Sequence, residues 1–132
     1  KRAVVENIEV GLGTDVGAGN TFSILESMAD AYKVQQLNGY RLTAFKAFYL
    51  ATLGGARSLD CAEVIGNFQV GSEADFLVLD KAATPLLEQR MSHCNDLAEE
   101  LFVLAMLGDD RCVHSTYIAG EPALMKDNSG IA

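Results

Sequence analysis

A single aspartate at the end of an apolar segment is the strongest candidate for chemistry in this chain. Residues Ile8–Leu12 are mostly apolar and predict a short strand, which runs directly into Gly13, Thr14 and Asp15. In α/β enzymes the loops at the C-terminal ends of strands converge on a cleft. Asp15 is therefore a candidate catalytic or metal-binding residue. A turn residue close to a helix is the competing interpretation.

Two other patterns are weaker. The glycines at positions 11, 13 and 17 suggest a dinucleotide-binding loop, but their spacing is one residue too long for that motif. Four side chains of a kind that binds zinc lie in the second half of the chain, at His93, Cys94, Cys112 and His114. Their spacing matches no common zinc module, so ordinary surface or core positions are the favoured interpretation.

The composition favours one domain, or part of one, in a cytoplasmic setting. The chain has 132 residues and 49% hydrophobic residues, but no apolar run approaches the roughly 20 residues that cross a bilayer. Three scattered cysteines argue against a disulfide framework. A formal net charge of -8 disfavours nucleic acid as a partner, and the lysines and arginines are dispersed along the sequence.

The hydrophobic periodicity predicts three main helical regions. A helix begins near Thr21, with the capping-box spacing of Ser23 and Glu26, and ends at Asn38 and Gly39. Thr43 caps a second helical region, and Thr52 caps a further turn of it. A third helix follows Asp96 and Glu99, which again have capping-box spacing, and ends at Gly108.

Three strands complete the predicted order. Residues 74–79 form an apolar run typical of a strand buried on both faces. Residues 113–118 predict another strand, and a turn at Gly120 and Glu121 leads into a third at 123–125. The helices carry more apolar side chains than a 132-residue domain needs, which indicates an interface with a larger partner surface and thus part of a bigger molecule. A homo-oligomer is also expected.

Several segments together resemble the guanine deaminases, a family of metal-dependent amidohydrolases. They are VGLGTD (10–15), AYKVQQL (31–37), ATLGGARSL (51–59), IGNFQVGSEADFLVLD (65–80), LGDDR (107–111) and TYIAGEP (116–122). The resemblance covers nearly the whole chain, and the last two segments are its most family-specific part.

The resemblance implies an α/β fold that is the C-terminal fragment of a (β/α)₈ barrel. Residues 1–62 would hold the eighth barrel strand and its following helices. Residues 63–132 would hold strands of the small flanking β-sandwich, with an inserted helix near 96–107. Asp15 would be the family's aspartate, which binds the catalytic zinc and moves a proton to and from the attacking water.

Most of the family's active site is missing from these 132 residues. The first-strand His-x-His pair, the later metal histidines and the catalytic glutamate are absent. A zinc site needs three or four protein ligands, and Asp15 supplies one. The resemblance thus implies a parent protein that deaminates guanine with zinc, and a fragment that is inactive and holds no zinc tightly. A parent acting on another aminopurine, a pterin or a triazine, and a stand-alone interaction module, remain alternatives.

Overall fold

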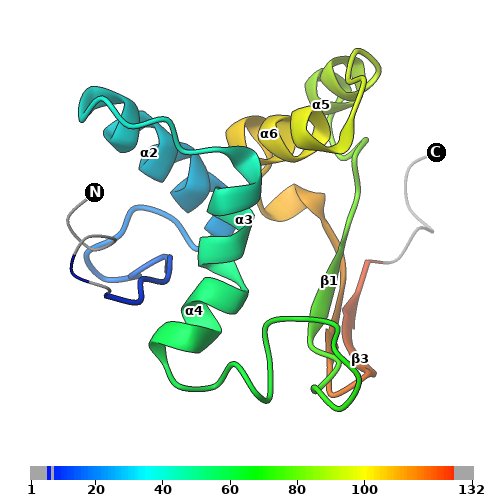
Figure 1. Ribbon diagram of the computed structural model, residues 1–132. Coiled ribbons are helices and arrows are strands. Elements are labelled where there is room, and N and C mark those ends of the chain that lie inside the picture. Colours follow the sequence, from blue (N-terminus) through cyan, green and yellow to red (C-terminus); the bar gives the residue numbers. More distant parts are fainter. Residues whose placement is uncertain (1–5, 7, 127–132) are drawn as a thin grey trace.

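A layer of helices and a small antiparallel sheet make up the part of the chain that the structure, a computed structural model, describes: residue 6 and residues 8–126 (Figure 1). The helices are α2 (Ile24–Leu37), α3 (Ala44–Ala51), α4 (Leu53–Ser58), α5 (Pro85–Met91) and α6 (Leu97–Leu107), with a 3₁₀ turn at Asp110–Cys112. The strands are β1 (Phe76–Leu79), β2 (Val113–Ile118) and β3 (Glu121–Met125).

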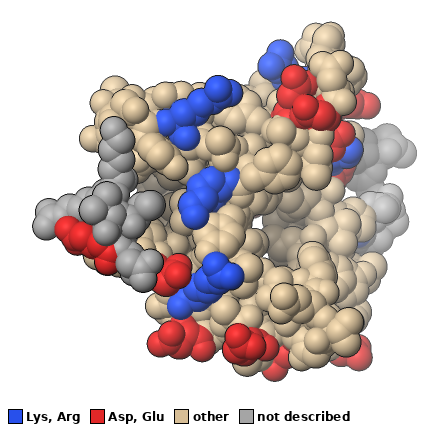
Figure 2. All heavy atoms as spheres, in the orientation of Figure 1, with Lys and Arg blue, Asp and Glu red and all other residues tan. Residues whose placement is uncertain are grey.

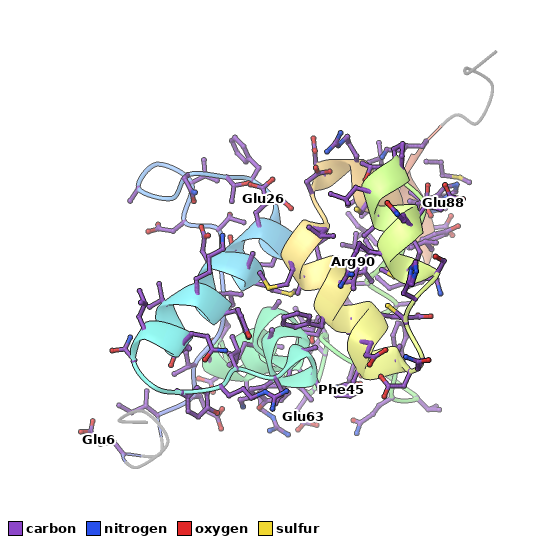
Figure 3. All side chains as sticks on the ribbon, turned by 90° about the horizontal axis from the view of Figure 1, so that it is seen from above. Glu6, Glu26, Phe45, Glu63, Glu88 and Arg90 are labelled. Carbon is purple, nitrogen blue, oxygen red and sulfur yellow. The ribbon has the colours of Figure 1, made fainter. Side chains whose placement is uncertain are left out.

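Helix α6 is the centre of the helical layer. It packs against α2, α3 and α5, and the view in Figure 3 shows α2, α6 and α5 next to one another. The large buried side chains that these helices contribute to the core are Leu25, Met28, Leu87, Val103 and Leu104. The rings of Tyr32 and Phe102 meet edge to face, with centroids 5.2 Å apart. Burial of this apolar surface is the main stabilising contribution in the helical layer.

Side-chain caps confirm two of the four predicted helix starts, those at Thr43 and Asp96. The Thr43 hydroxyl accepts a hydrogen bond from the Lys46 backbone N–H, and the Asp96 carboxylate accepts one from the Glu99 N–H. The predicted capping box at Ser23 is wrong, because its side chain makes no capping hydrogen bond. The backbone N–H of Ser23 bonds instead to the hydroxyl of Thr21.

The expected cap at Thr52 is also different in the structure. Its hydroxyl donates to the carbonyl oxygen of Phe48, in the preceding turn, at 2.8 Å. The side chain therefore satisfies the end of α3 and makes no capping bond to α4.

The sheet has the order β1-β2-β3, with both pairs antiparallel. Its hairpin turn lies one residue earlier than the sequence predicts, at Ala119 and Gly120, because both residues have positive φ angles, +51° and +82°. Two successive positive φ angles give the type I′ turn, whose twist suits a two-residue hairpin. Ile118 consequently pairs with Glu121.

The strand predicted at 74–79 is shorter and less buried than expected. β1 begins at Phe76, and the side chains of Leu77 and Val78 are exposed. The ring of Phe76 stacks on Tyr117 of β2, with centroids 4.5 Å apart. The prediction of burial on both faces is wrong for this chain because no further layer of described residues covers the sheet.

The strand predicted at Ile8–Leu12 is not formed. These residues pair with no strand in the described part of the chain. A strand is stabilised by its backbone ladder, so an apolar segment without neighbours stays outside any sheet. One backbone hydrogen bond, from the Leu12 N–H to the carbonyl oxygen of Leu50 at 2.8 Å, ties the segment to α3.

None of the described helices is long and apolar enough to cross a bilayer.

Candidate active site

Two helices hold the segment that leads to Asp15. The Leu12–Leu50 hydrogen bond joins it to the end of α3. At Gly11 the backbone lies so close to α4 that a Cβ atom there would come within 2.7 Å of the Cα of Gly55. The segment is thus seated against the α3–α4 region by a glycine-to-glycine contact and one backbone bond.

A tight turn follows at the Asp15 loop, by which we mean residues 15–20. Asp15 has a φ angle of +48°, in the left-handed region that few non-glycine residues adopt. Its carbonyl oxygen accepts two backbone hydrogen bonds, from Ala18 N–H at 3.1 Å and from Gly19 N–H at 2.5 Å. Val16 and Gly19 also form an isolated bridge. The loop therefore closes on the backbone of Asp15 itself.

The carboxylate of Asp15 has no polar partner within the described residues. Asp15 is exposed, and no hydrogen bond or ion pair from the described part of the chain reaches its side chain. Within the described residues, the backbone of the Asp15 loop therefore sets the direction of the Asp15 Cα–Cβ bond. A carboxylate oxygen is a suitable zinc ligand, so Asp15 fits a metal site as one of its ligands.

The other ligands of such a site are not found around Asp15. Among the described residues, no group of three or more histidine, cysteine, aspartate or glutamate side chains is placed to hold a metal ion. Tetrahedral zinc needs more donors than one carboxylate. The described residues therefore do not form a complete zinc site.

The four histidine and cysteine side chains considered for a separate zinc site are buried or contact other groups. The Nδ1 atom of His93 lies 2.8 Å from the carbonyl oxygen of Gln89 at the end of α5, and the Cys94 thiol faces the carbonyl oxygen of Arg90. Cys112 is buried in the core, and the Nδ1 atom of His114 lies 3.4 Å from the Ser115 hydroxyl. All three cysteines are unpaired.

The far end of the Asp15 loop is fastened to α2. The side-chain amide of Asn20 donates to the Asp30 carboxylate at 3.4 Å, and Lys33 pairs with the same carboxylate at 3.1 Å. The hydrogen bond from Lys33, and to a smaller extent that from Asn20, lowers the pKa of Asp30 below its ordinary value. An open polar hollow of about 260 Å³ lies here, between the start of α2 and the end of α6, and Asp15 is not among its lining residues.

Arg111 forms a local clamp with Asp109. Its guanidinium donates to both oxygens of the Asp109 carboxylate, with the shortest contact at 2.6 Å. The hydrogen bonds from Arg111 lower the pKa of Asp109, and the same contact raises the pKa of Arg111. The Asp109 carboxylate also caps the 3₁₀ turn by accepting from the Arg111 N–H. This motif thus fixes the connection between α6 and β2, and it has no contact with Asp15.

Basic side chains gather on one face, although they are dispersed in the sequence. Figure 2 shows them one after another across the region of α3 and α4. The Nζ atom of Lys46 lies 4.1 Å from the centroid of the Tyr49 ring, and Arg57 donates to the Tyr49 hydroxyl at 3.0 Å. Cation–π contact and a hydrogen bond therefore keep two cations around one ring.

Sequence reasoning located Asp15 but missed how its loop is closed. The signal that could have revealed it is the pair of glycines at 17 and 19. Gly17 has a φ angle of +125°, and a Cβ atom on Gly19 would lie 1.9 Å from the carbonyl oxygen of Thr14. Gly17 is needed for its backbone angle and Gly19 for its close contact with the backbone. In the sequence, however, the two residues look like the glycines of any loop.

Comparison with known proteins gives a consistent picture. The model of the amidohydrolase family matches residues 1–123. Guanine deaminase of Escherichia coli is 52% identical over 120 residues, which are 91% of this chain and 27% of that protein. The human guanine deaminase is 33% identical over 123 residues, 86% of this chain and 27% of that protein. The chain therefore spans about a quarter of the length of these curated relatives.

Solved structures agree with the sequence comparison. The crystal structure of guanine deaminase from Bradyrhizobium japonicum superposes with a TM-score of 0.82 at 32% identity, over 96% of this chain and 34% of that one. The E. coli guanine deaminase gives a TM-score of 0.92 at 49% identity, over 96% of this chain and 30% of that one. The arrangement of helices and sheet described above thus recurs within larger proteins.

Proposed function

We propose, on the premise that the chain belongs to the amidohydrolase family, that it is the C-terminal part of a guanine deaminase. The parent protein would convert guanine and water into xanthine and ammonia, the reaction implied by similarity to proteins named guanine deaminase. The observation that supports the proposal is similarity to guanine deaminases over 91% of the chain. The amidohydrolase family model matches residues 1–123 and therefore includes Asp15. The chain alone would be inactive, because its described residues provide one carboxylate of the site.

The place of the chain within the parent follows from the same proposal. Residues 8–12 would become the eighth strand of a (β/α)₈ barrel once neighbouring strands are present. Residues 1–62 would belong to the barrel and residues 63–132 to the flanking β-sandwich. Helix α6 falls in the second of these parts, yet packs against α2 and α3 of the first. It would therefore join the sandwich strands to the barrel helices.

Asp15 would have two tasks in the parent, as a zinc ligand and as a proton acceptor. When bound, zinc supplies a Lewis acid that makes hydroxide available near neutral pH. The Asp15 carboxylate would take the proton of the attacking water as the oxygen bonds to the carbon that carries the amino group of guanine. It would then return that proton to the departing nitrogen, which leaves as ammonia. The exposed and unpartnered carboxylate suits a group that must face a ligand.

A substrate panel on the full-length protein tests the function. We expect the zinc-loaded protein to release ammonia from guanine with a kcat/KM at least tenfold above that for adenine, a pterin or a triazine. Removal of the metal by a chelator should abolish turnover, and added zinc should restore it. A tenfold preference for one of the other substrates would favour a different amidohydrolase, and no turnover with any of them would contradict the proposal.

The coding sequence upstream of residue 1 distinguishes this proposal from the alternative of a stand-alone interaction module. An in-frame His-x-His motif about 250 residues upstream, one barrel length, supports a barrel parent. A stop codon directly before residue 1 with a start codon at it supports the module instead. A cytoplasmic location fits the three unpaired cysteines and remains part of the proposal.

We further infer that the isolated chain self-associates and keeps no zinc. Large apolar side chains are exposed on several elements, among them Phe22, Leu37, Phe68 and Val70. Such surfaces favour association in water. Sedimentation of the isolated chain is expected to show a dimer or larger species, and dialysis against a chelator should leave it without metal. A monomer at dilute concentration would contradict the first expectation, and bound stoichiometric zinc the second.

A further inference from the structure

We propose that Gly17 and Gly19 are positioning residues, which aim the Asp15 carboxylate by closing the Asp15 loop. The inference rests on the proposed function, because it gives Asp15 the role of zinc ligand and proton acceptor. Neither glycine is proposed to touch metal or substrate. They act through the backbone conformation of Asp15.

The first step is that nothing else in the described residues holds the Asp15 side chain. Its carboxylate has no hydrogen-bond or ion-pair partner in that part of the chain. The direction of its Cα–Cβ bond is therefore set by the backbone angles of Asp15. The φ angle of +48° lies outside the regions that L-residues ordinarily adopt, so the chain must hold it there.

The second step is that the Asp15 loop itself holds this φ angle through its backbone hydrogen bonds. The carbonyl oxygen of Asp15 receives the backbone N–H groups of Ala18 and Gly19. These two donors converge on one acceptor because the chain reverses at Gly17, whose φ angle of +125° is strained for any residue with a Cβ atom. The reversal brings Gly19 directly beside Thr14 and Asp15.

The third step is steric. A Cβ atom on Gly19 would lie 1.9 Å from the carbonyl oxygen of Thr14 and 2.9 Å from that of Asp15. Both contacts are with backbone, which cannot rotate away as a flexible side chain does. An alanine at 19 must therefore open the loop, and Asp15 is then free to return to an ordinary negative φ angle. That change swings the carboxylate to a new direction.

The experiment uses the full-length protein with three glycine-to-alanine variants. Gly19→Ala introduces the clash, and Gly17→Ala introduces backbone strain in open space, since nothing lies within 4 Å of its Cβ position. Gly71→Ala is the matched control. It also has a positive φ angle, +102°, and open space around its Cβ position, but it lies in the loop before β1.

We expect Gly19→Ala to lower kcat for guanine by about 100-fold, the effect of an ångström-scale misplacement, with a much smaller change in KM. Zinc affinity, measured by chelator competition, should fall by about 10-fold or more. Gly17→Ala should change both quantities in the same direction and by less. Gly71→Ala should leave kcat and zinc affinity within about twofold of the wild type, because it shares only the backbone strain.

Thermal unfolding of each variant separates positioning from loss of fold. If Gly19→Ala does not fold, Gly17→Ala carries the test, because it adds no clash. The inference is overturned if the Gly17 and Gly19 variants keep wild-type zinc affinity and kcat, or if Gly71→Ala loses as much of both as Gly17→Ala does. A wild-type protein that does not deaminate guanine would instead overturn the proposed function.

Discussion

Replacing Asp15 with asparagine in the full-length protein is expected to lower kcat for guanine by a factor between about 10² and 10⁴, the usual range for loss of a general acid–base group. Asparagine tolerates the left-handed backbone conformation, so the Asp15 loop should keep its shape. The amide cannot take a proton from water and is a poorer zinc ligand. Steady-state kinetics and metal analysis of the same preparation measure both effects.

The control for this variant is another aspartate with the same backbone conformation. Asp60 has a φ angle of +57° and is exposed, but it follows α4 and lies far along the chain from the Asp15 loop. Asp60→Asn should leave kcat and zinc content unchanged. Normal guanine turnover and full zinc content in the Asp15→Asn protein would remove Asp15 from the active site.

The helices could be predicted from the sequence because their signals are local. Thr43 and Asp96 each cap a helix through a backbone N–H three residues later, and this depends on spacing alone. Ser23 has the same spacing before Glu26, but its side chain makes no capping bond. Its backbone N–H, the group that Glu26 would bind in a capping box, donates to the Thr21 hydroxyl. Spacing therefore fixes which residues can cap, and the path of the preceding loop decides which of them do.

The strands were harder because they depend on what lies beside them. Residues 8–12 have the apolar character of a barrel strand, yet no described strand pairs with them. The run at 74–79 pairs on one edge with β2, but Leu77 and Val78, which point to opposite faces of the strand, stay exposed. Both segments have the composition of buried strands in a larger protein. Composition indicates that a segment is buried, but it does not show whether the elements that bury it lie within these 132 residues.

The candidate site shows the same division. The residue type and the preceding apolar segment made Asp15 a candidate, and the resemblance to the guanine deaminases made it the favoured one; its role stays a prediction. The closure of its loop brings Gly19 so close to the carbonyl oxygen of Thr14 that a Cβ atom would not fit. No sequence pattern predicts this contact. Asp109 and Arg111 lie in a segment that the sequence analysis singled out for its resemblance to the family, and in the structure they pair with each other.

The largest loss of stability is expected from Leu87→Ala. Leu87 lies on α5, is fully buried, and belongs to the core cluster shared with α6. Its truncation removes apolar contacts and leaves a cavity, at a cost of about 2–5 kcal/mol in the free energy of unfolding. The Thr84 cap is kept, because it binds the backbone N–H of residue 87. Urea unfolding of the full-length protein, followed by circular dichroism, measures the change.

Leu86, the residue before Leu87, provides the matched control for this variant. Leu86 has the same side chain on the same short helix but is 55% exposed. Leu86→Ala should change the free energy of unfolding by no more than about 0.5 kcal/mol, because little packing is lost at an exposed position. Equal losses in the two variants would mean that the parent protein covers Leu86 as well. In that case α5 would be an internal helix of the whole enzyme, and the exposed side of the helical layer seen here would be one of its contact surfaces.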